Sequence, residues 1–355
     1  MKTSLRQAAT PQHRSQPRRN NRQQRKTPSS GQHPRRRFLA LATGALALPA
    51  VSRMARAQAY PTSPITMIVA FPAGAATDAV GRILVERMRS SLGQPIVIEN
   101  VGGADGSIGT GRAARAKADG YTIVLGLLET HVINGALYPL QYDVLKDFAP
   151  ILPLVRTSYI LTARKTMPGK DVPELIAWLK ANPNKASAGI PNGAVRLLMA
   201  LFEKETATRF AFVPFRGGAP AMQDLVAGHI DLGFFAPFQL PLVRAGSIKA
   251  YAVTSDTRLT LAPDISTFAE VGLPALSFSP WEAFFAPKGT PMEIIGRLNA
   301  SAAEALADPA VRSRLVDLGF EVFPRERQTP EALGALQKAD IEKWWPIIKE
   351  LGMKP

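Results

Sequence analysis

The chain has 355 residues, with 43 Lys or Arg against 28 Asp or Glu and no cysteine. Its net charge of +15 would suit a nucleic acid or an anionic membrane, but residues 1–59 hold 13 of the basic residues and no acidic one. The other 296 residues carry 30 basic and 28 acidic groups, so they lack the basic surface that grips a phosphate backbone, and no nucleic-acid partner is expected. The absence of cysteine excludes disulfides, thiolate zinc sites, iron–sulfur clusters and cysteine nucleophiles.

Residues 1–59 have the order of an export signal that follows a disordered basic start. The sequence Arg-Arg-Arg-Phe-Leu at 35–39 leads into an apolar stretch of 14 residues, 38–51, shorter than the ~20 residues that span a bilayer. An A-x-A pattern then predicts cleavage after Ala59. The arginine pair before Phe-Leu favours the twin-arginine route, with the ordinary secretory route as the alternative. The mature protein is expected in the periplasm and outside the membrane, because no other apolar run approaches the length of a membrane span.

From Tyr60 onward, short apolar runs alternate with amphipathic segments, which predicts an α/β fold with mostly parallel sheets. The length of the mature chain suggests two domains. The expected strands are 65–71, 96–100, 121–128, 151–155, 159–163, 186–189, 212–215, 230–235, 248–254 and 281–286. A first helix is expected around Val80. Further helices are expected at 109–118, 173–181, 195–207, 219–227, 291–307, 309–318 and 330–350.

Gly- and Ala-rich segments follow three of the expected strands, at the positions where ligands collect in α/β sheets. Small residues let the backbone approach a ligand, and the N–H groups of the following helix favour an anion. Together the segments 72–78, 100–107 and 190–194 predict a site for a small carboxylate. Each loop alone could simply turn the chain, and Thr77 and Asp78 could serve only to cap a helix.

Motifs that would indicate catalysis are weak in the mature chain. The segment Gly109–Ala114 matches a dinucleotide fingerprint loosely, with Glu129 after the next strand, but eight residues separate its first glycine from the preceding strand. No G-x-S-x-G elbow occurs, and neither His131 nor His229 has a second ligand at metal spacing. The sequence therefore predicts a protein without enzymatic activity, catalytic residues, metal or cofactor.

About nine short motifs stand in a fixed order along residues 60–355. The most specific is VPFRGGAPAMQDLVAGHID at 213–231, and FPAGAATD at 71–78 and APKGTP at 286–291 are further members of the series. In this order the motifs resemble those of the substrate-binding proteins of tripartite tricarboxylate transporters, also called Bug receptors. The resemblance implies a type II periplasmic-binding-protein fold, with two α/β domains and a ligand cleft between them. It implies a first domain of residues 60–160 and 286–355, and a second of residues 161–285.

The resemblance also implies a small organic acid, or an amino or hydroxy acid, as ligand. Backbone amides of the first two loops and groups from the second domain would hold it. Three departures from the family pattern bear on ligand identity. Ala75 and Asp105 stand where the family usually has glycine, and the loop 187–193 has one extra residue and is followed by Arg196 in the place of a histidine. If Asp105 faces the cleft, its charge favours a ligand that carries an amine or hydroxyl group. The implied ligand-binding residues are Ala73, Gly74, Ala75, Ala76, Thr77, Asp78, Gly103, Ala104, Asp105, Gly106, Ser107, Thr130, Gly189, Asn192, Gly193 and Ala194.

Two functions fit these features. The first is a periplasmic receptor that captures a small carboxylate and delivers it to the permease subunits of a tripartite tricarboxylate-type transporter. The alternative is a sensor receptor that presents a bound metabolite to a membrane signalling protein. Both would act as monomers, and both need the same ligand cleft.

Overall fold

Two β-sheets organise residues 60–353, which are the residues that the computed structural model describes. The predicted export signal lies outside this range. The strand order is β11-β4-β10-β3-β1-β2 in the first sheet and β7-β6-β8-β5-β9 in the second. The mixed α/β architecture that the sequence predicted is confirmed.

The strands form where the sequence has short apolar runs, and most of their residues are buried. The first sheet contains β1 (Ile65–Val69), β2 (Ile96–Asn100), β3 (Thr122–Leu127), β4 (Phe148–Arg156), β10 (Trp281–Pro287) and β11 (Glu321–Val322). The second contains β5 (Ile160–Arg164), β6 (Ser187–Ile190), β7 (Ala211–Pro214), β8 (Leu232–Phe235) and β9 (Ile248–Val253).

The expectation of mostly parallel sheets is correct for only part of each sheet. The neighbours β1, β2 and β3 are parallel, as are β6, β7 and β8. The strands at the two crossings between the sheets are antiparallel to their neighbours: β10 to β3 and β4, and β5 to β8 and β9. The chain leaves the first sheet at the end of β4 and returns to it at the start of the adjacent strand β10. Because the chain leaves and returns at the same end of these two neighbours, they run in opposite directions.

Helices cover the sheets and connect the parallel strands. They are α1 (Ala76–Leu92), α2 (Ser107–Ala114), α3 (Asn134–Leu137), α4 (Val172–Ala181), α5 (Gly193–Thr206), α6 (Gly218–Ala227), α7 (Leu240–Arg244), α8 (Met292–Ala307), α9 (Pro309–Asp317) and α10 (Pro330–Glu350). Short helical turns are η1 (Ala104–Gly106), the π-helical η2 (Glu129–Ile133), η3 (Pro237–Gln239), η4 (Pro274–Leu276) and η5 (Arg325–Arg327). The sequence did not anticipate η2, α3, α7 or β11.

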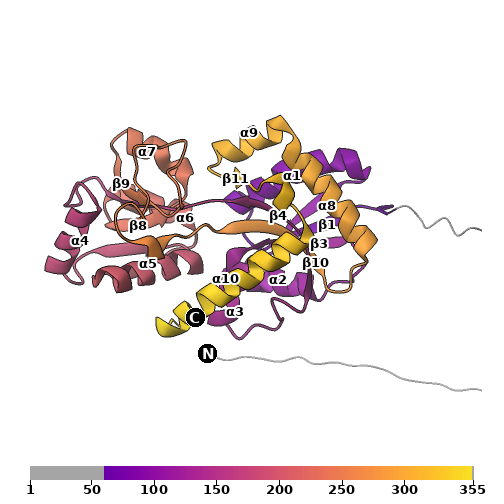
Figure 1. Ribbon diagram of the computed structural model, residues 1–355, viewed down its shortest axis with the longest axis horizontal. Coiled ribbons are helices and arrows are strands. Elements are labelled where there is room, and N and C mark those ends of the chain that lie inside the picture. The colour runs from indigo at the N-terminus through magenta and orange to yellow at the C-terminus, as the bar shows by residue number, and fades with distance from the viewer. Residues whose placement is uncertain (1–59, 354–355) are drawn as a thin grey trace, which may run out of the picture. The chain divides into compact units, whose positions relative to one another are not determined.

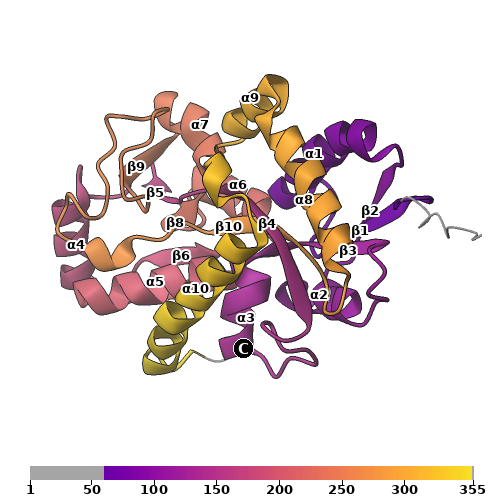
Figure 2. The same ribbon diagram turned by 45° about the vertical axis from the view of Figure 1, so that its right-hand side comes forward.

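Helices from distant parts of the chain pack side by side on the first sheet. Figure 1 shows α8 beside α1, and these two helices contact each other. Figure 2 shows α10 crossing in front of β4, with which it is also in contact. The C-terminal helices therefore complete the core around the N-terminal strands, and they leave the carboxyl ends of β1, β2 and β3 to the loops that were predicted to bind a ligand.

Candidate ligand-binding site

The first predicted loop is held by Asp78, in the first turn of α1. The buried Asp78 carboxylate accepts hydrogen bonds from the N–H of Gly74 at 2.9 Å, from two nitrogens of Arg82 at 2.8 and 3.0 Å, and from Asn100 Nδ2 at 3.0 Å. Burial opposes ionisation, but these hydrogen bonds together lower the pKa of Asp78. Both carboxylate oxygens are thus engaged within the protein. Asp78 fixes the loop and keeps its charge.

The neighbouring Thr77 points to a carboxyl group from the far end of the chain. Its hydroxyl donates a hydrogen bond to Glu282 Oε1 at 3.0 Å. Glu282 is only 6% exposed, and its other oxygen, Oε2, has no hydrogen-bond partner among the described residues. Burial raises the pKa of Glu282 to about 8, so this carboxyl group is neutral at pH 7 and sits beside the N-terminus of α1.

The second predicted loop contains two residues in the left-handed backbone region, Ala104 with φ 48° and Asp105 with φ 49°. This region favours glycine, although Asp tolerates it better than most residues do. The Asp105 carboxylate accepts a hydrogen bond from the Tyr138 hydroxyl at 2.6 Å. A Cβ atom built on Gly193 would lie 3.7 Å from Asp105 Oδ2, so the side chain of Asp105 faces the N-terminus of α5.

Two predicted site residues have their groups engaged elsewhere. The Thr130 hydroxyl accepts a hydrogen bond from the N–H of Leu127 at 3.0 Å and lies 2.9 Å from His131 Nδ1, so it is used at the end of β3. Gly189 lies inside β6, and a Cβ atom there would come within 2.6 Å of Ile230. Gly189 therefore permits close packing in the second sheet.

Glu129, next to Thr130, reaches the third predicted loop. Its Oε1 accepts a hydrogen bond from the N–H of Gly193 at 2.7 Å, and the N–H of Ala194 also hydrogen-bonds to this carboxyl group. Glu129 is 4% exposed. Burial, reinforced by the nearby charge of Asp105, raises the pKa of Glu129 to about 8 despite these two hydrogen bonds.

Tyr159 interacts with Glu129 and Glu282, which belong to the first sheet's side of the site, and with Asn192, which follows β6 of the second sheet. Burial raises the pKa of its phenol, and the charges of Glu129 and Glu282 raise it further, while a hydrogen bond to the Asn192 side chain lowers it. The same phenol is therefore within electrostatic reach of both buried carboxyl groups and in contact with the loop after β6. Loops that follow β1, β2, β3 and β6 thus converge near Tyr159.

The residues of the three predicted loops differ in their exposure to solvent. Ala73, Gly74 and Ala76 are exposed, and Ala75 is partly exposed. Gly103 and Ala104 are exposed, Ser107 is partly exposed, and Gly106 is buried. Asn192 is partly exposed, and Gly193 and Ala194 are buried.

Sequence reasoning missed four groups of this arrangement: Glu129 as a candidate binding residue, Glu282, Tyr138 and Tyr159. One signal was available. Glu282 interrupts the apolar run of β10, every residue of which is buried, and Glu129 directly follows the apolar β3. A single carboxyl group in or beside a buried strand is costly unless it has a function or a partner.

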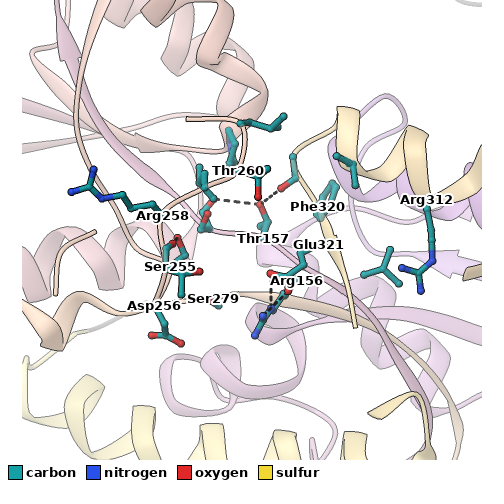
Figure 3. A pocket seen from close by; sticks show the side chains of 18 residues that line it. Arg156, Thr157, Ser255, Asp256, Arg258, Thr260, Ser279, Arg312, Phe320 and Glu321 are labelled. Carbon is teal, nitrogen blue, oxygen red and sulfur yellow. Dashed lines mark hydrogen bonds and ion pairs between the residues drawn. The ribbon is translucent and has the colours of Figure 1, made fainter. Parts of the chain in front are cut away.

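A separate pocket of about 460 Å³ lies at the crossings between the sheets (Figure 3). The link 156–158, the loop 255–261 and the segment 319–322 contribute to its wall. In its wall Arg156 forms an ion pair with Glu321, its neighbour on the adjacent strand, at 2.6 Å, and the Thr157 hydroxyl donates a hydrogen bond to the carbonyl of Gly319 at 3.1 Å. None of the sixteen residues expected to bind a ligand lines this pocket, so it is distinct from the arrangement around Tyr159.

Two further properties concern residues 60–353 alone. No group of three or more His, Asp or Glu side chains in this range is arranged to hold a metal ion. No helix in this range combines the length and the apolar character that crossing a membrane requires.

Comparisons with known proteins agree with the fold. Residues 80–353 match the model of the tripartite tricarboxylate transporter family receptor. BugT of Bordetella pertussis is 33% identical over 323 residues, which cover 90% of this chain and 98% of BugT. The structure of MatC from Rhodopseudomonas palustris with bound malate has a TM-score of 0.75 and 35% identity, and covers 81% of this chain and 100% of MatC.

A second R. palustris protein, solved with adipate, has a TM-score of 0.76 and 30% identity, over 83% of this chain and 99% of that one. The type II periplasmic-binding-protein fold that the motifs implied is confirmed by these similarities. The chain belongs to the tripartite tricarboxylate transporter receptor family, whose members are periplasmic solute-binding proteins of the Bug type.

Proposed function

We propose that this protein is a periplasmic receptor that captures a small organic carboxylate and delivers it to the permease of a tripartite tricarboxylate-type transporter. The two sheets form the cores of two domains, residues 60–160 with 286–355 and residues 161–285. The ligand binds between them, and the domains close over it. Binding is the whole function, and no chemical step follows.

The observation that carries this proposal is the direct link between the sheets at the predicted loops. Glu129 follows β3 of the first sheet, and Gly193 follows β6 of the second, yet their polar atoms lie 2.7 Å apart. Tyr159 is within reach of groups from both sides. A ligand placed at this point contacts both domains, which is the requirement for a receptor that closes on its ligand.

The N-terminus of α1 is the position best suited to a ligand carboxylate. Its N-cap residue is Ala75, and no side chain caps this helix. The unpaired N–H groups of a helix start carry partial positive charge. Glu282, neutral at pH 7, lies beside this end with its Oε2 unpaired. Because Thr77 donates to Oε1, the proton of Glu282 is available on Oε2 for a ligand carboxylate.

The similar proteins of known structure support the ligand class. MatC was solved with malate and the second R. palustris protein with adipate, and both ligands are small dicarboxylates. No observation on residues 60–353 favours the sensor alternative, so delivery to a permease is the function proposed here.

Native mass spectrometry of protein purified without refolding tests the proposal. We expect a bound compound of low mass that dissociates on unfolding and contains at least one carboxyl group. Glu282→Gln should weaken binding of that compound, because the amide cannot donate from the same position with the same strength. A ligand-free protein that gives no binding heat with a broad panel of small carboxylates would contradict the proposed function.

A further inference from the structure

The pocket of about 460 Å³ at the crossings, which we call the rear groove, is lined by the link 156–158, the loop 255–261 and residues of the segment 312–322. In the first sheet, β4 and β10 separate β11, which lines the groove, from β1, β2 and β3, whose loops form the candidate site. In the second sheet, β8 and β5 separate β9, which precedes the loop 255–261, from β6, which precedes Gly193. The groove and the candidate site therefore lie on opposite sides of the segments that connect the sheets.

These two connecting segments are paired with each other. The N–H of Thr157, directly after β4, donates a hydrogen bond to the carbonyl of Pro280, directly before β10, at 2.9 Å. The Thr157 hydroxyl also donates to the carbonyl of Gly319 at 3.1 Å. A Cβ atom built on Gly319 would lie 3.1 Å from Pro237, which follows β8 of the second sheet. This close contact between the two sides thus lies beside the connecting segments, where a rotation about them moves atoms least.

The rest of the two walls is not joined. Figure 3 shows Ser255 on one side of Thr157 and Arg312 on the other. Within residues 60–353, no hydrogen bond or ion pair connects the loop 255–261 with the segment 312–322. Leu261 on the first wall is 41% exposed and Val316 on the second is 44% exposed. Both side chains would lose apolar contact with water if the walls came together, and such burial is favourable.

Complementary charges also belong to the two walls. Arg156, at the end of β4, forms its ion pair with Glu321 of the first sheet. The hydrogen bond with Glu321 raises the pKa of Arg156, and the charge of Asp256, on the second domain's wall, raises it further. Arg156 and Asp256 therefore attract each other across the groove, and this attraction grows as the distance between the walls falls.

The structure combines a linked candidate site with a wide rear groove. The N–H of Gly193 donates to Glu129 at 2.7 Å and so connects the two sheets at the site, while the groove behind the connecting segments has a volume of about 460 Å³. A rotation about the connecting segments moves the parts on their two sides in opposite senses. Separation of Glu129 from Gly193 would therefore narrow the groove.

We propose that the rear groove sets the balance between the open and closed forms: Leu261 and Val316 come together when the ligand cleft opens, and their contact stabilises the open form. The inference rests on the proposed function for its link to affinity, because a ligand that binds the closed form binds less tightly when the open form is more populated. It makes residues that do not touch the ligand determinants of affinity. Contact in the groove opposes ligand capture and favours release.

Engineered cysteines test whether the walls meet. The chain has no cysteine, so Leu261→Cys with Val316→Cys introduces one thiol on each wall and no others. We expect copper phenanthroline in air to form a disulfide between them in ligand-free protein. Adding Glu129→Ala, which removes the link at the site, should speed this oxidation by about threefold or more. Saturating malate, succinate or adipate, whichever binds, should slow it, and the oxidised protein should bind about tenfold more weakly until dithiothreitol reduces it.

Polar substitutions test the energetic effect without a cross-link. Leu261→Ser and Val316→Ser should each tighten binding of the same probe by about threefold, and by about tenfold together, because the open form loses its apolar contact. Their radius of gyration without ligand should be smaller than that of the unmutated protein. Asp256→Asn should act in the same direction, and high salt should remove its effect. The matched control is Val97→Ser, 53% exposed on β2 at the far edge of the first sheet, which should change neither quantity.

Failure of the inference differs from failure of the proposed function. The inference is wrong if no disulfide forms, if Glu129→Ala and ligand leave its rate unchanged, or if the serine variants bind no more tightly than the Val97→Ser control. The proposed function stands in that case, since the probe still binds. If no small carboxylate binds or is recovered with the protein, while Glu129→Ala speeds the disulfide as expected, the proposed function is wrong and the movement of the groove remains.

Discussion

The hydroxyl oxygen of Thr77 lies 3.0 Å from Oε1 of Glu282, although the two residues are 205 positions apart in the chain. This hydrogen bond joins the start of α1 to the start of β10, the strand through which the chain returns to the first sheet. Within the described part of the chain, Thr77 is the only hydrogen-bond partner of the buried Glu282 carboxyl group. Together with Glu129, Glu282 gives the site two buried carboxyl groups, and burial raises the pKa of both.

The first prediction concerns the pH dependence of stability. The pKa values of Glu129 and Glu282 rise from 4.5 to about 8 on folding. At a pH between 4.5 and about 8, the two carboxyl groups have lost their protons in the unfolded chain but keep them in the folded protein. The free energy of unfolding should therefore fall as the pH rises. The expected slope is at most about 1.4 kcal/mol per pH unit for each group, levelling off above pH ~8. Urea unfolding at several pH values, followed by tryptophan fluorescence, measures this slope.

The control for this prediction is a pair of Glu→Gln variants. Glu282→Gln keeps an acceptor for Thr77 but cannot titrate, so its stability should depend less steeply on pH than that of the unmutated protein. The exposed Glu86→Gln should leave the slope unchanged. An equal slope in Glu282→Gln and the unmutated protein would show that Glu282 ionises normally in the folded state.

The second prediction separates a structural carboxylate from the ligand-binding groups. Asp78→Asn removes the negative charge of the carboxylate to which Gly74, Arg82 and Asn100 donate hydrogen bonds. Because the folded pKa is lowered, Asp78 contributes stability above its unfolded pKa of 3.8, and this contribution disappears as the pH falls through the lower, folded value. We expect a loss of about 1–3 kcal/mol at pH 7. The difference from the unmutated protein should shrink in acid.

Ligand affinity provides the control for Asp78→Asn. The folded variant should bind a small carboxylate with unchanged affinity, since both oxygens of Asp78 are engaged within the protein. A change in affinity without a loss of stability would place Asp78 among the groups that contact the ligand.

Local sequence patterns were sufficient for most elements of the fold. The strand 96–100 was predicted to the residue, and the apolar run of β10 was placed within one residue of its observed end. The antiparallel direction of β10 could not be predicted from periodicity, because strand direction depends on where the chain returns and not on the residues within the strand.

The candidate site was predictable only at the level of loops. The segments after β1, β2 and β6 were identified because Gly and Ala cluster there before a helix. Which side chains face one another depends on tertiary packing. Glu129 and Gly193 are 64 positions apart, and Glu129 lies in η2, a π-helical turn that no local signal announces. The sequence marked Asp105 as a departure from the family pattern, and in the structure its side chain faces Gly193.

The third prediction concerns export and lies on residues 1–59. The double variant Arg35→Lys, Arg36→Lys should leave uncleaved precursor in the cytoplasm, because the twin-arginine route requires the arginine pair. Cell fractionation with N-terminal sequencing checks this, and the exported protein should begin at Tyr60. Secretion that persists unchanged in the double variant would exclude the twin-arginine route and leave the ordinary secretory route.

The last prediction is closure on ligand binding. Groups from both sheets surround the candidate site, so a ligand there binds the closed form better than an open form and shifts the population toward it. X-ray scattering at saturating ligand should give a smaller radius of gyration than the ligand-free protein. Glu129→Ala is an informative variant, since it removes the hydrogen bond at 2.7 Å that already links the two sheets without ligand.

Ligand-free Glu129→Ala should therefore be at least as extended as the unmutated protein and should contract by a larger amount when it binds. Glu86→Gln, remote from this link, should contract by the same amount as the unmutated chain. If scattering curves with and without ligand superimpose for every variant while calorimetry shows binding, then the protein binds in one fixed conformation. In that case the hydrogen bond from Gly193 to Glu129 holds the two sheets together with and without ligand.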